Sequence, residues 1–204
     1  MNNRNYDKLM TEFLKEHGGK TLLLHSCCAP CSSYCLEEVA PLVKTTVFYY
    51  NPNLDSREEY DKRKSEQKRL LLEMGLAEFL DCDYFHEEFE EIAKGYENER
   101  EGGARCERCF RLRLEHTAEA AKEHGFFAFG TTLTVSPLKN AQLINKLGFE
   151  IAERAGVQYM PSDFKKRGGY LRSIELSKQY ELYRQNYCGC EYSKNSEEKN
   201  EIII

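Results

Sequence analysis

The hydrophobic pattern of the first fifty residues alternates between helix-like and strand-like segments. In residues 6–16 apolar side chains recur at spacings of three and four, which predicts an amphipathic helix that ends before two glycines. A short apolar run at 21–25 predicts a first strand, and β-branched and aromatic residues at 44–50 predict a second. Residues 32–42 between them fit a helix, so the chain opens on a β-α-β unit.

The rest of the chain continues this alternation. Further strands are expected at 78–82, 126–133 and 157–159, and further helices at 56–75, 86–94, 106–125, 140–155 and 170–184. Parallel strands need crossover connections, so the pattern predicts an α/β fold: a mostly parallel sheet with helices on both faces, in a Rossmann-like three-layer architecture. We expect one domain over residues 1–192, carrying the functional site, and a disordered polar tail over 193–204.

Composition narrows the class of protein. The chain has 204 residues, of which 41% are hydrophobic, and no apolar run long enough to span a membrane, so a cytoplasmic protein is expected. Nine cysteines in that compartment, an odd number, argue against a static disulfide framework. They favour metal binding or redox chemistry instead.

Three of the cysteines follow the first strand directly. Cys27, Cys28 and Cys31 lie in the loop after that strand, at the sheet edge where α/β proteins usually bind ligands. Cys106 and Cys109 begin a later helix and can reach the same edge. Together Cys27, Cys28, Cys106 and Cys109 make a two-plus-two thiolate set, which suits an iron-sulfur cluster or a tetrahedral zinc ion.

Two arguments favour the cluster over zinc. Adjacent cysteines on a kinked loop are expected to point apart, which makes it awkward for them to share one ion. A cluster offers separate irons instead. The arginines at 105, 108 and 111 are expected to offset the anionic charge of four thiolates. Ligand type alone allows both metals, so zinc stays an alternative.

The remaining cysteines have other expected roles. Cys188 and Cys190 are separated by one glycine, and a disulfide between them would be strained and easily reduced, which suits electron relay. Further metal ligands, or idle thiols at a helix end, are rival interpretations. Cys35 and Cys82 are expected to pack in the core.

The same loop suggests two other classes of function. Cys28-Ala-Pro-Cys31 fits a thioredoxin-like C-x-x-C motif, but that interpretation leaves the other cysteine motifs unexplained. The loop also lies where nucleotide-binding proteins place phosphate-cradling glycines. It contains none, which argues against ATP binding.

Charge is unevenly distributed along the chain. The net charge is −5, yet residues 105–113 and 163–172 each carry a net charge of +3, while residues 87–101 carry −5. A polarised surface is therefore expected. Lys165, Lys166, Arg167 and Arg172 are candidate contacts for nucleic acid, although such a run is often an ordinary solvated loop.

Four motifs in order carry a resemblance to a known family. They are Leu-Leu-Leu-His-Ser-Cys27-Cys28-Ala-Pro-Cys31, Tyr49-Tyr50-Asn51-Pro52-Asn53, Arg105-Cys106-x-x-Cys109-Phe-x-x-Arg113 and Tyr187-Cys188-Gly-Cys190. From about Leu22 to Ser193 the chain resembles the QueH-type epoxyqueuosine reductases. The resemblance implies an ATP-pyrophosphatase-like fold and a cytoplasmic enzyme that performs the last step of queuosine biosynthesis in tRNA with a GUN anticodon, using an external electron donor.

The resemblance also implies roles for individual residues. A [4Fe-4S] cluster would be bound by Cys27, Cys28, Cys106 and Cys109, and Cys188 and Cys190 would form the redox-active pair. A second iron beside the cluster is expected, with Cys31 and Asp83 as its suggested ligands. Tyr187, Tyr192 and His25 are candidate proton donors that can equally be packing or capping residues. A zinc-structured nucleic-acid-binding module and a thioredoxin-like oxidoreductase remain alternative functions.

Overall fold

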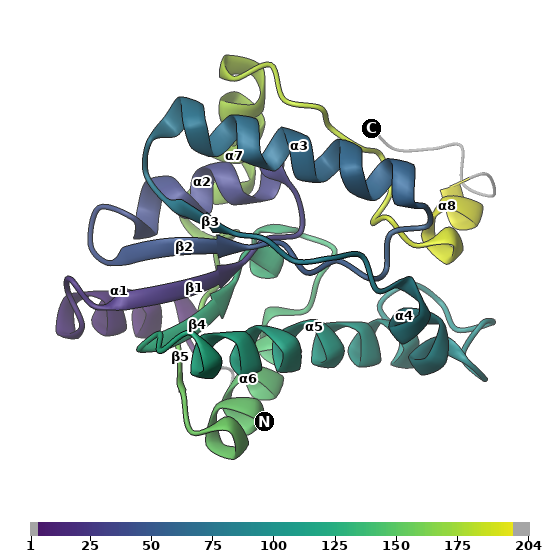
Figure 1. Cartoon of the computed structure of the whole chain (residues 1–204), viewed down its shortest axis with the longest axis horizontal. Helices are drawn as coiled ribbons and strands as arrows, with labels where there is room; N and C mark the ends of the chain where they lie inside the picture. The colour runs from purple at the N-terminus through teal and green to yellow at the C-terminus, as the bar shows by residue number, and fades with distance from the viewer. Residues whose placement is uncertain (1–3, 198–204) are drawn as a thin grey trace.

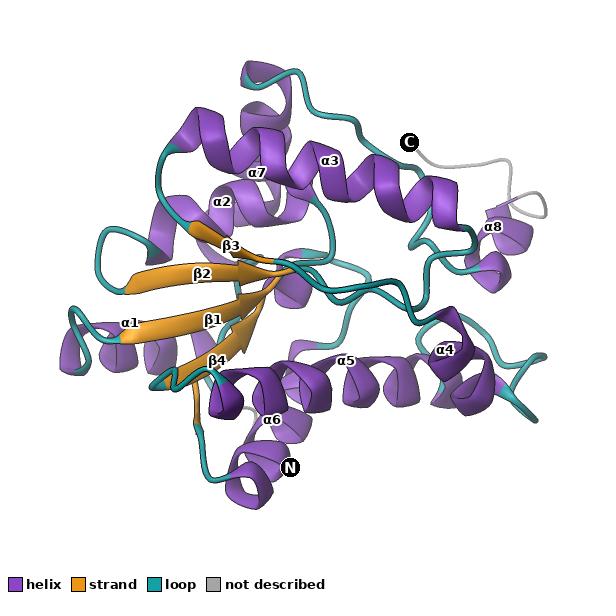
Figure 2. Cartoon of the chain, in the orientation of Figure 1, coloured by secondary structure: helices purple, strands orange, loops and turns teal. Residues whose placement is uncertain are grey.

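Five parallel strands form the central sheet of the computed structural model, which describes residues 4–197. They are β1 (Thr21–His25), β2 (Lys44–Phe48), β3 (Glu78–Leu80), β4 (Ala128–Thr131) and β5 (Gln158–Tyr159). Their order across the sheet is β3-β2-β1-β4-β5, and every pair is parallel (Figure 2). Because β1 lies between β2 and β4, the strand order reverses direction at β1.

Helices cover both faces of this sheet (Figure 1). They are α1 (Tyr6–Glu16), α2 (Ala29–Val39), α3 (Arg57–Met74), α4 (His86–Ala93), α5 (Ala104–Glu123), α6 (Ala141–Ala155), α7 (Gly169–Gln179) and α8 (Glu191–Glu197), with 3-10 turns at Thr132–Val135 and Lys166–Gly168. Within residues 4–197, no helix is both long and apolar enough to cross a membrane. The predicted three-layer α/β architecture is confirmed.

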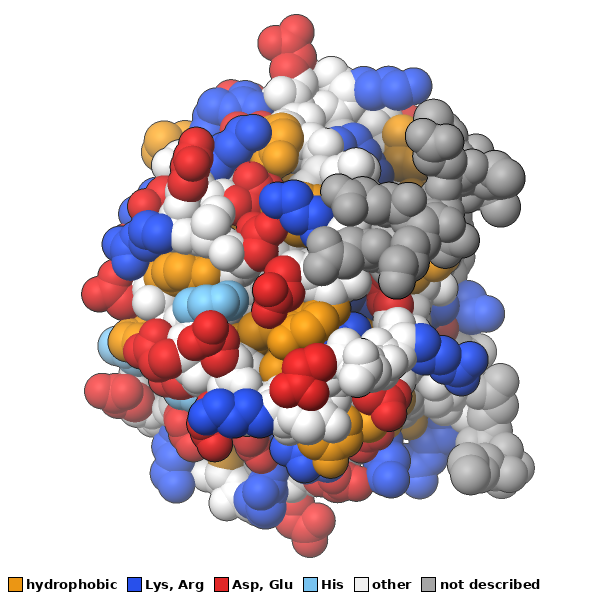
Figure 3. Space-filling model, turned by 90° about the vertical axis from the view of Figure 1, so that its right-hand side faces the viewer, with side chains coloured by type: hydrophobic (Ala, Val, Ile, Leu, Met, Phe, Trp, Pro, Cys, Tyr) orange, Lys and Arg blue, Asp and Glu red, His pale blue; other side chains and the backbone are white. Residues whose placement is uncertain are grey.

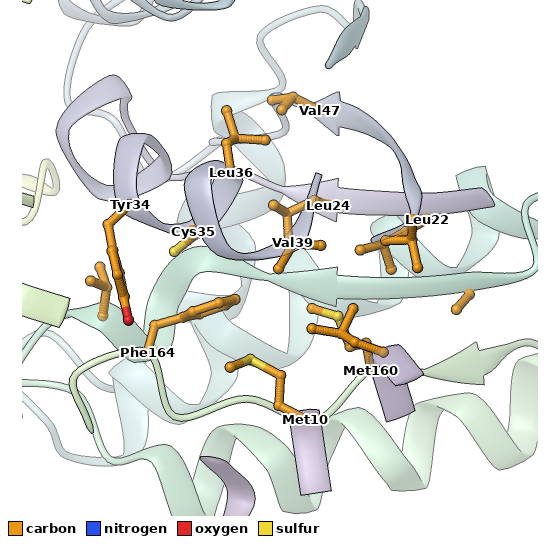
Figure 4. Packing of buried hydrophobic residues seen from close by; sticks show 14 of the residues in the cluster. Met10, Leu22, Leu24, Tyr34, Cys35, Leu36, Val39, Val47, Met160 and Phe164 are labelled. Atoms are coloured by element: carbon orange, nitrogen blue, oxygen red, sulfur yellow. The ribbon is translucent and has the colours of Figure 1, made fainter. Parts of the chain in front are cut away.

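Side chains of β1 point alternately to the two faces of the sheet and pack in two separate hydrophobic clusters. Leu22 and Leu24 face α1, α2, α3 and α7, and their cluster includes Cys35, Met160 and Phe164 (Figure 4). Leu23 points to the opposite face and packs with residues of α5 and α6. Successive strand residues point to opposite faces, so the continuous apolar run of β1 serves both layers.

Several boundaries differ from the sequence expectation. α2 begins at Ala29 rather than at residue 32, so Cys31 lies in its first turn. The strand expected over 126–133 ends at Thr131 and continues as a 3-10 turn, and the last long helix ends at Gln179. The tail expected over 193–204 begins as helix, because α8 runs to Glu197; residues 198–204 lie outside the described part of the chain.

Candidate metal and redox site

Three thiols meet in the loop between β1 and α2. The Sγ atoms of Cys27 and Cys28 are 4.0 Å apart, and those of Cys27, Cys28 and Cys31 all lie within 4.8 Å of one another. The expectation that the two adjacent side chains point apart is therefore wrong. Cys28 is the extended N-cap of α2, and Pro30 in the first turn starts the helix early, which brings Cys31 back towards the loop.

The three thiols share one negative charge. The pKa of Cys27 is held well below its ordinary value because the thiols of Cys28 and Cys31 donate to it. The same interaction, with burial, raises the pKa of Cys28 to about 12 and that of Cys31 well above its usual range. The N-terminus of α2 also favours a thiolate here. The arrangement therefore favours ionisation of Cys27 over that of Cys28 and Cys31.

Buried hydrogen bonds fix the loop that carries these thiols. The Cys27 backbone N–H donates to Thr132 Oγ1 over 3.3 Å, which ties the loop after β1 to the turn after β4. Ser26 and Ser32, on either side of the thiols, both donate to Gln67 Oε1 of α3, at 2.7 and 2.8 Å. The loop therefore lies at the point where the strand order reverses, which is where open α/β sheets bind ligands.

The second cysteine pair lines a neighbouring cavity. Cys106 and Cys109 lie in the first two turns of α5, and both border a cavity of about 20 Å³ that Cys188 and Cys190 also line. Burial raises the pKa of Cys109 to about 12, although the nearby Arg113 charge lowers it.

A larger cavity of about 190 Å³ contains the Cys27 group. The two cavities share lining residues Glu101, Leu138, Lys139 and Cys188, so they adjoin. Seven of the nine cysteines line one or both of them: Cys27, Cys28, Cys31, Cys106, Cys109, Cys188 and Cys190. Segments far apart in the sequence thus bring their thiols to one end of the sheet.

The turn between Cys188 and Cys190 requires glycine. Gly189 has φ +121°, and a Cβ there would lie 2.4 Å from Leu54 Cδ2. The Gly189 carbonyl accepts a hydrogen bond of 2.9 Å from the Asp55 N–H, which docks the turn onto the loop after β2. Cys188 faces both cavities, whereas Cys190 is buried with Sγ 3.6 Å from Ser193 Oγ.

Three other expected residues lie outside the cavity lining. Asp83 is on the surface, with its side chain 72% exposed and its carboxylate 3.6 Å from Arg57. Cys35 is fully buried in the α2 core, and its Sγ donates to the Cys31 carbonyl (Figure 4). Cys82 is half-buried and donates to the Tyr49 carbonyl. The interpretation of Cys35 and Cys82 as packing residues is supported.

Of the three arginines expected to balance the thiolates, Arg105 lies beside them: it lines the smaller cavity, and its charge opposes the rise that burial causes in the pKa of Cys106 and Cys190. Arg105 donates to three backbone carbonyls between residues 96 and 99, Arg108 contacts the Tyr96 side chain, and Arg111 pairs with Glu150. Arg113, a fourth arginine of this helix, is buried and hydrogen-bonds His25 at the end of β1. It is 1% exposed, and the negative charges of Cys109 and Cys27 raise its pKa although burial lowers it.

The predicted basic segment is largely neutralised. Lys165 pairs with Asp163 at 3.0 Å, Arg167 with Asp7 at 2.9 Å and Glu38 at 3.1 Å, and Arg172 with Glu37 at 2.7 Å and Glu175 at 3.0 Å. Lys166 alone of the four is exposed with no ion pair to the described residues.

Two cations that the sequence did not single out line the larger cavity. Lys139 and Arg184 border it, and neither pairs with a carboxylate in the described part of the chain. Arg184 is exposed and donates only to Ser177 Oγ, over 2.9 Å. Burial lowers the pKa of Lys139, but the negative charges of Cys188 and Cys27 outweigh burial and raise it.

The three candidate proton donors lie in different surroundings. Burial and the neighbouring Arg113 lower the pKa of His25 to about 3, so its ring is neutral. Tyr192 packs against the Arg105 guanidinium, whose Cζ lies 4.2 Å from the centroid of the tyrosine ring. Tyr187 lines the larger cavity, and its hydroxyl donates to Asp55 Oδ1 over 3.1 Å. Burial, with the nearby Glu59 and Asp55, raises its pKa to about 12.

Comparison with known proteins identifies relatives over most of the chain. A family model described as epoxyqueuosine reductase QueH matches residues 22–196. The chain is 42% identical to the epoxyqueuosine reductase QueH of Staphylococcus epidermidis, with 93% of this chain and 84% of that protein covered. It is 40% identical to the protein of that name from Streptococcus pyogenes (93% and 78% covered) and 37% identical to that from Thermotoga maritima (85% and 90% covered).

Proposed function

Because the chain belongs to the QueH family of epoxyqueuosine reductases, we propose that it reduces epoxyqueuosine to queuosine in tRNA with a GUN anticodon, the last step of queuosine biosynthesis. We place the reaction in the cytoplasm. The observation that carries the proposal is the gathering of seven thiols around two adjoining cavities at the sheet edge. A core does not need this many sulfurs at one end of a sheet.

The residues present fit a thiolate-bound metal centre. In the smaller cavity Asn53 Oδ1 is buried and has no hydrogen-bond partner among the described residues, so the cavity offers an acceptor as well as sulfurs. We propose that Cys27, Cys28, Cys106 and Cys109 hold a [4Fe-4S] cluster. For a second iron we propose Cys31, which lies beside Cys27 and Cys28. Asp83, the other suggested ligand, would have to leave Arg57 to take part.

A single metal ion is the competing possibility for the first three thiols. Two thiolates bound tetrahedrally to one ion at the usual zinc–sulfur distance lie about 3.8 Å apart. The 4.0 Å between Cys27 and Cys28 is close to that value. Taken alone, the distance thus favours a single shared ion for these two thiols, and iron and sulfide analysis has to decide between that ion and the proposed cluster.

The dithiol can supply the electrons and protons that the reaction consumes. Breaking both C–O bonds of the epoxide gives an alkene and water, and consumes two electrons and two protons. When bound, an iron-sulfur cluster supplies electrons singly, and an adjacent iron acts as a Lewis acid on the departing oxygen. We propose that Cys188 and Cys190 are oxidised to a disulfide, which releases two electrons and two protons. An external electron donor then reduces them again.

Tyr187 is our proposed proton donor to the departing oxygen. It lines the same cavity as Cys188, and its raised pKa of about 12 keeps the hydroxyl protonated at neutral pH. Asp55, which accepts from Tyr187, also pairs with Lys194 at 3.1 Å. This ion pair holds Asp55 as an acceptor that orients the tyrosine.

We propose that the anticodon loop enters the larger cavity from the α7 side. Lys139 and Arg184 offer charges to phosphates there, and Tyr170 and Leu138 offer exposed apolar surface on which splayed bases can stack. Lys166 is the member of the predicted basic segment that is free to join them. Lys165, Arg167 and Arg172 could contribute only by exchanging carboxylates for phosphates.

The opposite approach is less favourable for RNA. On the face that carries α4 and α8, acidic side chains border an apolar patch (Figure 3). The acidic helix α4 contributes Glu87 and Glu88 in its first turn alone. Phosphates approaching over this face would meet like charge, which supports entry from the side of Arg184.

The test is conversion of epoxyqueuosine-tRNA by the anaerobically reconstituted protein under reducing conditions. We expect queuosine from the unchanged chain, with sulfide present and iron in excess of sulfide by the one additional ion, and loss of both product and sulfide in Cys106→Ala. Cys82→Ala, which removes a half-buried thiol outside the cavities, is the matched control and should retain activity.

Other outcomes point to the alternative functions. Zinc without sulfide would favour a zinc-structured nucleic-acid-binding module, and conversion that survives removal of the metal would favour a thioredoxin-like oxidoreductase. A fully loaded protein that leaves epoxyqueuosine unchanged would contradict the proposed reaction.

A further inference from the structure

Arg113 is a buried charge with no acidic partner. Its side chain lies in α5, one turn after Cys109, and is 1% exposed. Its Nε donates to His25 Nε2 over 3.2 Å and its Nη2 to Asn51 Oδ1 over 2.6 Å. Over residues 4–194, no Asp or Glu carboxylate forms an ion pair with it.

Both hydrogen-bond acceptors are neutral. The pKa of His25 is lowered to about 3 by burial and by Arg113, so its ring is neutral; Nε2 lies between the Arg113 guanidinium and the Tyr50 carbonyl, 3.1 Å from the latter, and Nδ1 lies 3.0 Å from Thr131 Oγ1. Asn51 is fixed in turn, because its Nδ2 donates to the Ser26 carbonyl. The network therefore orients the positive charge without cancelling it.

An uncompensated buried cation is strongly unfavourable in a protein interior, so a nearby negative charge is expected. Arg113 lies one helical turn after Cys109 and hydrogen-bonds His25, two residues before Cys27, so the thiolates of these cysteines, with that of Cys188, are the charges that stabilise its charged form against burial. These belong to three different segments of the chain, all of which line the two cavities. Arg113 thus connects the helix that carries Cys109 to the strand end that precedes Cys27.

We propose that Arg113 is the fixed counter-charge of the thiolate-bound centre and raises its reduction potential, with His25 and Asn51 as the residues that position it. This inference rests on the proposed function, because it presumes a redox-active metal held by these thiols. A fixed positive charge stabilises the reduced state, which carries one more negative charge, relative to the oxidised state. Arg113 is a positioning residue and contacts no reacting atom.

The experiment is an anaerobic redox titration of the reconstituted centre, with iron and sulfide measured on each sample. For Arg113→Met we expect the midpoint potential to fall by about 59 mV or more, which is a tenfold change in the equilibrium constant of a one-electron couple. Arg113→Lys keeps the charge and should restore most of the potential. Arg111→Gln removes an arginine of the same helix that pairs with Glu150, and should leave the potential unchanged.

A second variant protects the test against loss of the fold. Asn51→Asp places a carboxylate where Arg113 Nη2 now donates to an amide, so it cancels the charge and leaves the arginine in place, and its iron content shows whether the loop tolerates loss of the Nδ2 bond to the Ser26 carbonyl. We expect the same downward shift in potential. Iron-loaded Arg113→Met or Asn51→Asp with an unchanged potential would overturn the inference, whereas absence of iron and sulfide from the unchanged protein would instead overturn the proposed centre.

Discussion

The backbone N–H of Cys27 donates to Thr132 Oγ1, and the Sγ of Cys27 lies 3.6 Å from the same hydroxyl. Thr132 is fully buried at the start of the 3-10 turn after β4. One hydroxyl therefore joins the two loops that flank the point where the strand order reverses. The position of the first thiol depends on a residue 105 positions away in the sequence.

Replacing Thr132 by Val should loosen this junction. The substitution keeps the shape but leaves the Cys27 N–H without an acceptor, which costs about 1–3 kcal/mol for a buried donor. We expect the metal-free protein to unfold at lower urea concentration and the reconstituted protein to retain less iron. Thr11→Val is the control, because its hydroxyl bonds only the Asp7 carbonyl within α1. Equal losses in both variants would contradict a specific role for Thr132.

The sequence predicted the architecture well because local signals and tertiary packing agree. The limits of α1 and β1 match the expected ranges, and the helix expected from residue 56 begins there, with the Ser56 hydroxyl accepting from the Glu59 N–H as its N-cap. The early start of α2 was missed although Pro30 is a signal for it, since proline is favoured in the first turn of a helix.

The electrostatics of the site were predicted less well, because the partner of a charge is set by the tertiary fold. Arg172 binds Glu37, 135 positions away, and no local pattern reveals this pair. Arg113 and Arg111 are arginines of the same helix, yet Arg113 is buried and hydrogen-bonds His25, whereas Arg111 pairs with Glu150. Helical periodicity separates their faces, but it does not say which face meets the metal site.

Proton release should report the shared charge of the three thiols. Since Cys28 and Cys31 have raised pKa values and Cys27 a lowered one, binding of Co²⁺ as a probe near pH 7 should release about two protons. Affinity should then rise about 100-fold per pH unit until the two thiols ionise. A pH indicator measures the release, and Cys31→Ala should reduce it to about one. Release of three protons would show that Cys27 is not a thiolate beforehand.

Removing the hydroxyl of Tyr187 should slow the reaction without removing the metal. We expect kcat to fall about 10²–10⁴-fold in Tyr187→Phe, the range for loss of a general acid. Because the Tyr187 pKa is raised to about 12, its ionisation should not reduce the activity of the unchanged protein between pH 7 and pH 10. Tyr183→Phe is the control, since that hydroxyl bonds Glu59 and does not line the larger cavity. Full activity of Tyr187→Phe would remove Tyr187 from the mechanism.

The geometry of the Cys188–Cys190 turn should be sensitive to one methyl group. Gly189→Ala introduces a side chain at φ +121° and places it against Leu54, so the turn has to move. A strained backbone position of this kind costs about 1–3 kcal/mol. In the unchanged protein Cys190 should be alkylated more slowly than Cys188. In Gly189→Ala we expect this difference to disappear as the turn opens, and multiple-turnover activity to fall. Gly75→Ala, at φ +62° with open space around it, is the matched control for backbone strain alone.

Substitution of two arginines distinguishes a surface that binds RNA from one whose charges are already neutralised. Arg184 lines the cavity without a carboxylate partner in the described part of the chain, whereas Arg172 binds both Glu37 and Glu175. Arg184→Gln should therefore weaken tRNA binding and reduce the slope of log affinity against log salt by about 0.7, the value for one contact to a single-stranded phosphate.

Arg172→Gln should change that slope little, because any phosphate contact there has to displace two carboxylates already bound. Titrations of the same tRNA at several salt concentrations compare the variants, and the iron content of each confirms that the site is intact. If Arg172→Gln instead caused the larger loss, the RNA would bind along the original basic segment, and the cavity rim would serve only the reacting nucleoside.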